Sequence, residues 1–368
     1  MKPLSSVMDK TKEKMKGIFS GTKIIPRLTM RCCMLGARGV GKTSVIASLY
    51  SSHREAVSGT ELFLLPDGET QQILQGKRAM LEKMFTGLHD KYDLVTESGL
   101  PGDARESIFR FSYGMRSERI NIDLEIRDYP GEYLRTEPER VAEFVQEADA
   151  VLIAIDTPCL MEADGKYDEA KNRPKLVKDF LKNHLKKDEE KLVMFVPLKC
   201  EKYFLEGRID EVTAKVEAEY GDLIAILKEK CSSSTGKKSI CCVVAPIQTL
   251  GEIAFDSFGK GEDGTIEEIV SSDGSVLPAH VNYHFIKADA TYKPKYCEQP
   301  LNYLLAFVSK HYASVKESSS EEGLFGKLAK ILRLIPNIDF FLLEMDKMGR
   351  RRLKDTQGYK VLCGRGRI

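Results

Sequence analysis

Hydrophobic and polar positions along the chain predict strands that alternate with helices. Short apolar runs typical of buried strands occupy residues 28–35, 150–156, 191–198 and 240–247. Residues with helical periodicity lie between these runs, at 138–147, 168–187 and 208–231. This alternation favours an α/β fold with a mixed, mostly parallel sheet and helices on both faces. Such a sheet binds ligands beyond the C-terminal ends of its strands.

A pair of antiparallel strands is predicted by alternating residues between 108 and 128. Aromatic residues alternate with other residues up to Tyr113, a turn follows at 114–117, and aliphatic residues alternate from Ile120 to Asp128. The pattern therefore places Asp128 at the end of a strand. A separate helical pattern from Gln71 to Leu88 predicts a helical insertion before this pair.

Composition limits the class of protein. The 368 residues, 42% hydrophobic and 30% charged, suffice for a large domain with an appendage, which excludes a disordered or fibrous chain. The longest apolar runs fall short of the ~20 residues that a membrane-spanning helix needs, and the N-terminus has no apolar signal core. We therefore expect a soluble, cytoplasmic protein. The nine cysteines show no metal-ligand spacing and are expected to be reduced, mostly core residues.

Charge is distributed unevenly. The formal net charge is +1, yet residues 1–31 carry eight basic and two acidic side chains, and residues 347–368 carry eight basic and one acidic side chain. The body between these two ends is therefore acidic. Basic ends of this kind are commonly solvated tails, and they also suit acidic lipid, RNA or a partner protein. Membrane or nucleic-acid contact by the termini stays open at this stage.

The most specific motif is a glycine-rich loop with the sequence Gly36-Ala37-Arg38-Gly39-Val40-Gly41-Lys42-Thr43. It matches G-x-x-x-x-G-K-[ST], follows a predicted strand and precedes a helical pattern. Glycines let consecutive backbone N–H groups turn toward a polyphosphate, and the next helix points its positive end at the same anion. We expect Lys42 to reach the β- and γ-phosphates and Thr43 to bind Mg²⁺, with Ser44 completing the nucleotide-binding set.

A second loop, Asp128-Tyr129-Pro130-Gly131-Glu132, follows the antiparallel pair. Its Asp128 is predicted to hold the same Mg²⁺, directly or through a water, because this metal prefers oxygen ligands. The Gly131 N–H is predicted to contact the γ-phosphate. An Asp-x-Pro-Gly turn is common on protein surfaces, so its meaning comes from its position after a phosphate loop and a strand.

With these two loops the chain resembles the GTPase class of P-loop proteins, which includes translation factors and small GTPases, over residues 28–315. The resemblance implies a small-GTPase-like fold that binds GTP or GDP with Mg²⁺. It also implies that Lys199 lies across the base, that Glu201 binds the guanine edge in place of the usual Asp, and that Gln248 lies in the last base-contacting loop. Leu198 cannot supply the usual polar contact, so ATP also stays possible.

Hydrolysis would depend on residues that differ from the pattern of the class. Glu132 stands where small GTPases usually have a Gln that orients the attacking water, and Arg38 stands where they often have Gly. The predicted catalytic set is therefore Lys42, Glu132 and Arg38. The threonine that should close over Mg²⁺ from a first switch loop falls between residues 51 and 107, where Thr96 is a candidate.

The outer segments suggest a narrower resemblance and a division of the chain. The insertion after the phosphate loop, the stretch 246–251 and the segment 280–312 look like those of the bacterial double-GTPase family of conflict and defence systems. We expect a basic segment over 1–27, the GTPase-like domain over 28–315, and an appendage over 316–368. In the appendage, residues 324–335 predict a basic amphipathic helix, and residues 340–343 and 359–363 predict short edge strands.

Three functions fit these observations. The first is a Mg²⁺-dependent guanine-nucleotide switch with slow hydrolysis that controls a partner protein, in the context of antiviral defence that the narrower resemblance implies. The second is a scaffold module that holds nucleotide without hydrolysing it. The third is an ATP-using P-loop NTPase or kinase, which would need an acceptor site and a lid bearing arginine.

Overall fold

The part of the chain that the structure describes contains most of the predicted elements. The computed structural model describes residues 28–83, 85, 95–97, 106–118, 120–185, 190–231, 240–271, 274–317, 332–333 and 335–368. The basic segment 1–27 and most of the amphipathic helix expected over 324–335 lie outside them. Among the described helices, none has the length and apolar character needed to cross a bilayer.

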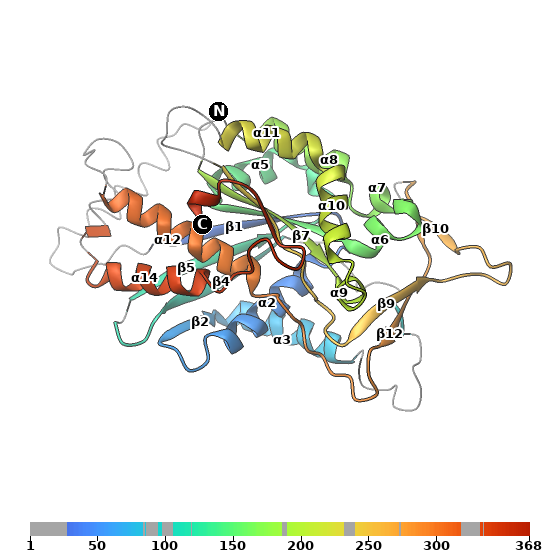
Figure 1. Cartoon of the computed structure of the whole chain (residues 1–368), viewed down its shortest axis with the longest axis horizontal. Coiled ribbons are helices and arrows are strands. Elements are labelled where there is room, and N and C mark those ends of the chain that lie inside the picture. The colour runs from blue at the N-terminus through green and yellow to red at the C-terminus, as the bar shows by residue number, and fades with distance from the viewer. Residues whose placement is uncertain are drawn as a thin grey trace.

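A mixed sheet forms the centre of the molecule (Figure 1). Within the described residues it has eight strands in the order β13-β8-β7-β6-β1-β5-β4-β2. The strands are β1 (Thr29–Leu35), β2 (Leu62–Pro66), β4 (Ser107–Met115), β5 (Ile120–Asp128), β6 (Ala150–Asp156), β7 (Lys191–Leu198), β8 (Ile240–Val244) and β13 (Lys360–Cys363). The run from β8 to β5 is parallel, whereas β4, β2 and β13 pair antiparallel. The mixed, mostly parallel sheet predicted from the sequence is confirmed.

Helices cover both faces of this sheet (Figure 1). Successive residues of β1 point to opposite faces, so Cys32 and Met34 belong to one apolar core and Cys33 and Leu35 to the other. The first core is closed by α2 (Lys42–Ala56), α12 (Gln299–Glu317) and α14 (Ile338–Gly349). The second is closed by α5 (Pro138–Glu147), α8 (Pro174–His184) and α11 (Gly221–Cys231). Burial on both faces explains why the central strands are continuous apolar runs.

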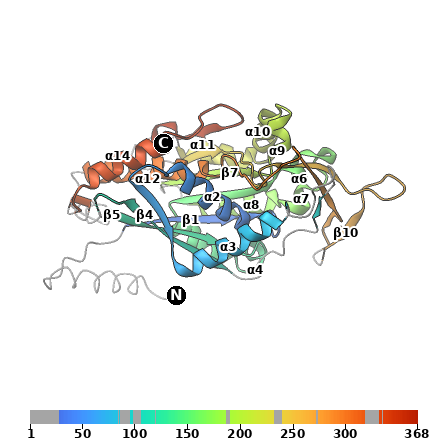
Figure 2. The same cartoon turned by 90° about the horizontal axis from the view of Figure 1, so that it is seen from below.

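A smaller sheet lies at the end of the molecule away from α14 (Figures 1 and 2). It has the order β3-β12-β9, beside a separate two-stranded hairpin. Its strands are β3 (Val95–Glu97), β9 (Ile253–Phe258) and β12 (Val281–Phe285), and the hairpin consists of β10 (Glu268–Val270) and β11 (Val276–Pro278). Thr96 pairs with Asn282 in this sheet. We expected Thr96 in a loop, and the structure places it in a strand instead.

The remaining helices refine the predicted pattern. The expected helix within 71–88 is α3 (Gly68–Lys83). The 168–187 stretch forms two helices, α7 (Asp168–Lys171) and α8, because Arg173 between them has a positive φ of 51° that ends the helix. The 208–231 stretch is likewise divided into α10 (Ile209–Glu219) and α11. Short helical elements complete the described fold: α4 (Tyr133–Thr136), α6 (Thr157–Met161), α9 (Glu201–Leu205), and the 3₁₀ turns η2 (Ala163–Gly165) and η3 (Arg365–Arg367).

The C-terminal end packs onto the domain. The edge strand predicted at 359–363 is confirmed, since β13 pairs with β8 and the buried Tyr359 hydroxyl donates to the Pro246 carbonyl over 2.5 Å. The strand predicted at 340–343 is wrong. Those residues lie in α14, whose buried side chains recur at helical spacing and pack on α12. Arg367 pairs with Glu190 at 3.2 Å, so this basic end is not a solvated tail.

Candidate functional site

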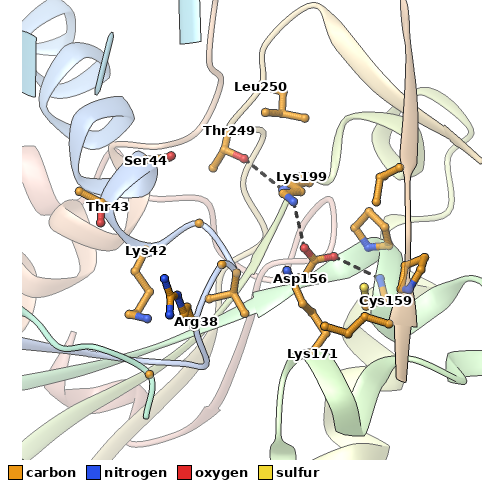
Figure 3. Close-up of a pocket in the computed structure, with 18 of the residues that line it drawn as sticks. Arg38, Lys42, Thr43, Ser44, Asp156, Cys159, Lys171, Lys199, Thr249 and Leu250 are labelled. Carbon is orange, nitrogen blue, oxygen red and sulfur yellow. Dashed lines mark hydrogen bonds and ion pairs between the residues drawn. The ribbon is translucent and has the colours of Figure 1, made fainter. Parts of the chain in front are cut away.

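A cavity of about 280 Å³ lies where the parallel strands end (Figure 3). Residues 38–44 of the glycine-rich loop, residues 128–131 after β5, and Asp156 at the end of β6 line it. Residues 249–250 and side chains of the smaller sheet close the opposite side. The cavity therefore occupies the C-terminal edge at which the sequence predicted a ligand site.

The glycine-rich loop adopts a backbone that requires its glycines. Gly36, Gly39 and Gly41 have φ values of 146°, 74° and 110°, which L-residues rarely adopt. Gly41 caps the 15-residue helix α2 without a side-chain hydrogen bond. Ala37 and Val40, which were predicted to bind nucleotide, have buried side chains and offer only their backbone. The loop and the start of α2 thus present main-chain N–H groups at the cavity.

Lys42 holds a positive charge against this loop. Its Nζ donates to the carbonyl oxygens of Gly36 at 2.9 Å and Ala37 at 3.0 Å. Burial lowers the pKa of the Lys42 ammonium, and the nearby Asp128 and Glu132 carboxylates oppose that shift. An anion in the cavity would favour the charged form of Lys42 in the same way that these carboxylates do.

Thr43 and Asp128 meet at the floor of the cavity. The Thr43 hydroxyl donates to Asp128 Oδ2 over 2.7 Å, although 85 residues separate the two in sequence. These are two of the three residues predicted to bind Mg²⁺. The third, Thr96, lies in β3, and its side chain is outside the part of the chain that the structure describes. A hydroxyl and a carboxylate are oxygen donors that suit Mg²⁺, so this pair fits the metal that the sequence motifs imply.

The loop after β5 packs directly on the glycine-rich loop. A Cβ added to Gly131 would lie 2.2 Å from the Arg38 backbone nitrogen and 2.4 Å from the Ala37 carbonyl carbon, so only glycine fits. The next residue, Glu132, lies 3.7 Å from the Arg38 guanidinium. Both side chains of this pair are substantially exposed, at 37% for Glu132 and 59% for Arg38, which makes the attraction weak.

The opposite side of the cavity contains a buried ion pair. Lys199 Nζ lies 2.9 Å from Asp156 Oδ2, and the Lys199 backbone N–H donates to the Thr249 hydroxyl over 3.3 Å (Figure 3). Burial opposes ionisation of Asp156, but Lys199 and Lys171 outweigh it and lower the pKa of this carboxyl. Lys199 also has a positive φ of 58°, a conformation that costs energy in a lysine and that is often found at functional sites.

Two residues expected at the base do not line the cavity. Glu201 Oε1 accepts hydrogen bonds from the backbone N–H groups of Leu250 at 2.5 Å and Gly251 at 3.1 Å, and its side chain is buried. Gln248 pairs through its backbone with Lys295. In their place Thr249 and Leu250 face the cavity. Glu201 therefore shapes the loop beside the cavity through its backbone contacts.

The buried Glu201 carboxyl gives a prediction about pH. Burial raises its pKa from 4.5 to about 7, so the unfolded chain loses this proton at lower pH than the folded chain does. The free energy of unfolding should therefore fall between pH 4.5 and 7, by on the order of 3 kcal/mol. Glu201→Gln keeps an acceptor oxygen and does not titrate, so urea unfolding of the variant should lack this slope. Parallel pH profiles of the two proteins would contradict the prediction.

Sequence reasoning missed several residues that line the cavity. Asp156 was recognised as the end of a strand, and its position at a C-terminal strand end could have marked it as a ligand-facing group. Lys171 and Lys77 lie on charged helices whose sequences resemble solvated faces, so no sequence signal distinguished them. Lining residues of the smaller sheet and its hairpin, Phe258, Ile269, Leu277, Val281 and Tyr283, could be found only from the tertiary structure.

The strand order and the placement of the two loops define a GTPase-like α/β P-loop fold. No protein-family model matches the chain, and no curated protein matches it. Among solved structures it is similar to the Saccharomyces cerevisiae Ski7 GTPase-like domain bound to GTP, at 14% identity over 61% of this chain and 43% of that chain, with a TM-score of 0.32. It is also similar to Sup35 complexed with GDP, at 10% identity over 63% and 40%, with a TM-score of 0.28.

The chain thus matches less than half the length of either structure. At these identities and TM-scores the likeness carries no argument about this chain. The assignment of the fold rests on the strand order and on the loops at the C-terminal edge of the sheet.

Proposed function

We propose that this protein is a Mg²⁺-dependent guanine-nucleotide-binding switch with slow GTP hydrolysis. The observation that carries the proposal is the contact between Thr43 and Asp128 at the cavity, beside the Lys42 ammonium. A lysine, a hydroxyl and a carboxylate beside the glycine-rich loop suit a nucleotide polyphosphate with its metal ion.

Each part of the site has a task in this proposal. The backbone of residues 36–43 and the Lys42 ammonium bind the phosphates, and Ser44 adds a hydroxyl at the same cavity. Thr43 and Asp128 would hold Mg²⁺, which when bound neutralises charge on the phosphate oxygens. Gly131 lies against the phosphate loop, where its N–H would sense a terminal phosphate.

Slow hydrolysis is supported by the state of the other predicted catalytic residues. Arg38 and Glu132 pair with each other, Arg38 is largely exposed and Glu132 partly exposed, and Glu132 is not among the residues that line the cavity. Neither side chain is therefore held rigidly toward a reacting phosphate. Preorganised groups account for most of the acceleration in phosphoryl transfer. A site without them is therefore expected to hydrolyse GTP slowly, as a switch does, and not at the rate of a high-flux enzyme.

An adenine nucleotide is the second candidate ligand. The placement of Glu201 favours it, because this carboxylate binds the backbone of residues 250–251 instead of facing the cavity. The side chain expected to select guanine therefore makes its hydrogen bonds to the backbone and not to a base in the cavity. Lys199 and Thr249 remain at the cavity and would contact either base.

Calorimetric titration of the purified protein with GTP, GDP and ATP, with Mg²⁺ or with EDTA, tests the proposal. We expect GTP and GDP to bind, ATP to bind at least about tenfold more weakly, and Mg²⁺ to strengthen GTP binding. Thr43→Val should remove the Mg²⁺ dependence, whereas Thr43→Ser should keep it. Absence of heat with every nucleotide would refute the proposal, and tighter binding of ATP would establish the second candidate. Single-turnover hydrolysis then separates a switch from a scaffold that holds nucleotide unchanged.

A partner protein is part of this proposal, since a switch acts by changing a contact with a partner. The resemblance to the bacterial double-GTPase family supports a partner within a conflict or defence system, and that part rests on the sequence motifs alone.

A further inference from the structure

Lys171 brings a second ammonium group to the phosphate loop. It is the last residue of α7 and lines the same cavity as Lys42 and Thr43. Its Nζ lies 3.2 Å from the point that a Cβ on Gly39 would occupy. The amine therefore lies against the backbone of the loop, although Lys171 follows Gly39 by 132 residues in the sequence and belongs to no recognised motif.

The position of Lys171 is fixed by the residue that follows it. Asn172 is buried, and its Oδ1 accepts a hydrogen bond from the Asp156 backbone N–H over 2.7 Å. Its Nδ2 donates to the Asp156 carbonyl over 3.1 Å and to Asp168 Oδ1 over 2.7 Å. The two bonds with Asp156 attach the end of α7 to the end of β6, and the bond to Asp168 holds the Asn172 amide against α7. Lys171 is therefore presented to the cavity by a buried polar network, not by a free loop.

The other cations at the cavity already have partners. Arg38 pairs with Glu132, Lys199 pairs with Asp156, and Lys42 donates to two carbonyl groups. Within the described residues, by contrast, no hydrogen bond or ion pair is made by the Lys171 amine. Lys42 and Lys171 both line the cavity, so two positive charges repel each other there. An anion between them would relieve this repulsion.

We propose that Lys171 is a phosphate-binding residue that α7 supplies from within the same chain. This inference rests on the proposed function. It adds a phosphate contact from a residue that lies outside the sequence motifs. The Lys171 ammonium binds the nucleotide phosphates from the side of the loop at Gly39. Positive charge brought to phosphates in this way both strengthens binding and stabilises charge that develops during phosphoryl transfer.

A purely structural role for Lys171 would be to balance the charge of Asp156, whose pKa it helps to lower. The two roles differ in what they predict for nucleotide binding. A structural lysine would stabilise the fold, so its removal would lower the melting temperature. A phosphate-binding lysine would also weaken nucleotide binding when it is removed, and an arginine in its place would restore that binding.

The test compares Lys171→Ala and Lys171→Arg with Lys175→Ala, which removes an exposed lysine from the neighbouring helix α8. We expect Lys171→Ala to weaken GTP and GDP binding roughly 10- to 100-fold, the loss of one charge-assisted contact. Lys171→Arg should restore most of the affinity, and Lys175→Ala should bind as the wild type does.

Two outcomes would overturn the inference while the proposed function stands. One is wild-type affinity for GTP and GDP in Lys171→Ala, and the other is a lowered melting temperature without nucleotide with no rescue of binding by Lys171→Arg. If the wild-type protein itself binds no nucleotide, the proposed function fails and this inference fails with it.

Discussion

Replacing Lys42 with alanine should abolish measurable nucleotide binding. The ammonium group is held at the carbonyl oxygens of residues 36 and 37, and its removal would deprive the phosphates of the charge at the centre of the loop. Hydrogen bonds to charged groups contribute about 1.5–3 kcal/mol each, so the loss of two phosphate contacts weakens binding by at least about 100-fold. Calorimetric titration of Lys42→Ala with GTP and GDP measures this loss.

Stability in the absence of nucleotide provides the control for Lys42→Ala. The cavity is open to water, which can satisfy the two carbonyl groups, so the free energy of unfolding should change by no more than about 1–2 kcal/mol. Lys175→Ala should leave both binding and stability unchanged. If Lys42→Ala binds GTP within threefold of the wild type, the glycine-rich loop is not the phosphate site.

A methyl group at Gly131 should separate the two loops of the site. The added Cβ of Gly131→Ala would lie 2.2 Å from a backbone atom of Arg38, far inside van der Waals contact, and neither backbone can yield as a flexible side chain would. The loop after β5 must therefore move, which takes Asp128 away from Thr43. We expect a loss of about 1–3 kcal/mol in the free energy of unfolding. The Mg²⁺ dependence of GTP binding should be lost as well, and urea unfolding with calorimetry measures both effects.

Gly76 offers a matched control for this substitution. It lies exposed within α3, and a Cβ there would meet no atom within 4 Å. Gly76→Ala should therefore raise the free energy of unfolding by about 0.5–1 kcal/mol, because alanine favours the helix. Equal effects at the two positions would contradict the close approach at Gly131.

The sequence predicted the parts of the site that depend on local backbone chemistry. The glycine-rich loop was recognisable because its positive φ angles restrict it to glycine at three positions. Asp128 was recognisable because an alternating strand ends on it. Both loops follow strands of one sheet, so their meeting at one edge was predictable, and the contact between Thr43 and Asp128 agrees with it.

The same local reasoning gave different results for Glu201 and residues 340–343. Glu201 occupies the position that the resemblance assigns to base recognition, yet the nearby backbone N–H groups of Leu250 and Gly251 compete for its carboxylate. Phe341 and Leu342 read equally well as strand or helix, because a short apolar run carries little periodicity. Packing of these residues against α12 stabilises the helix.

By itself, the sequence determined the central strands with the helices between them, the phosphate loop and the acidic end of β5, because propensity, periodicity and glycine conformation act over a few neighbouring residues. The tertiary structure alone decided that Lys171 faces the loop, that Glu201 turns away from the cavity and that the smaller sheet closes it. Those features depend on groups far apart in the chain that compete for the same partners, and a residue's own neighbours in sequence do not determine which partner it obtains.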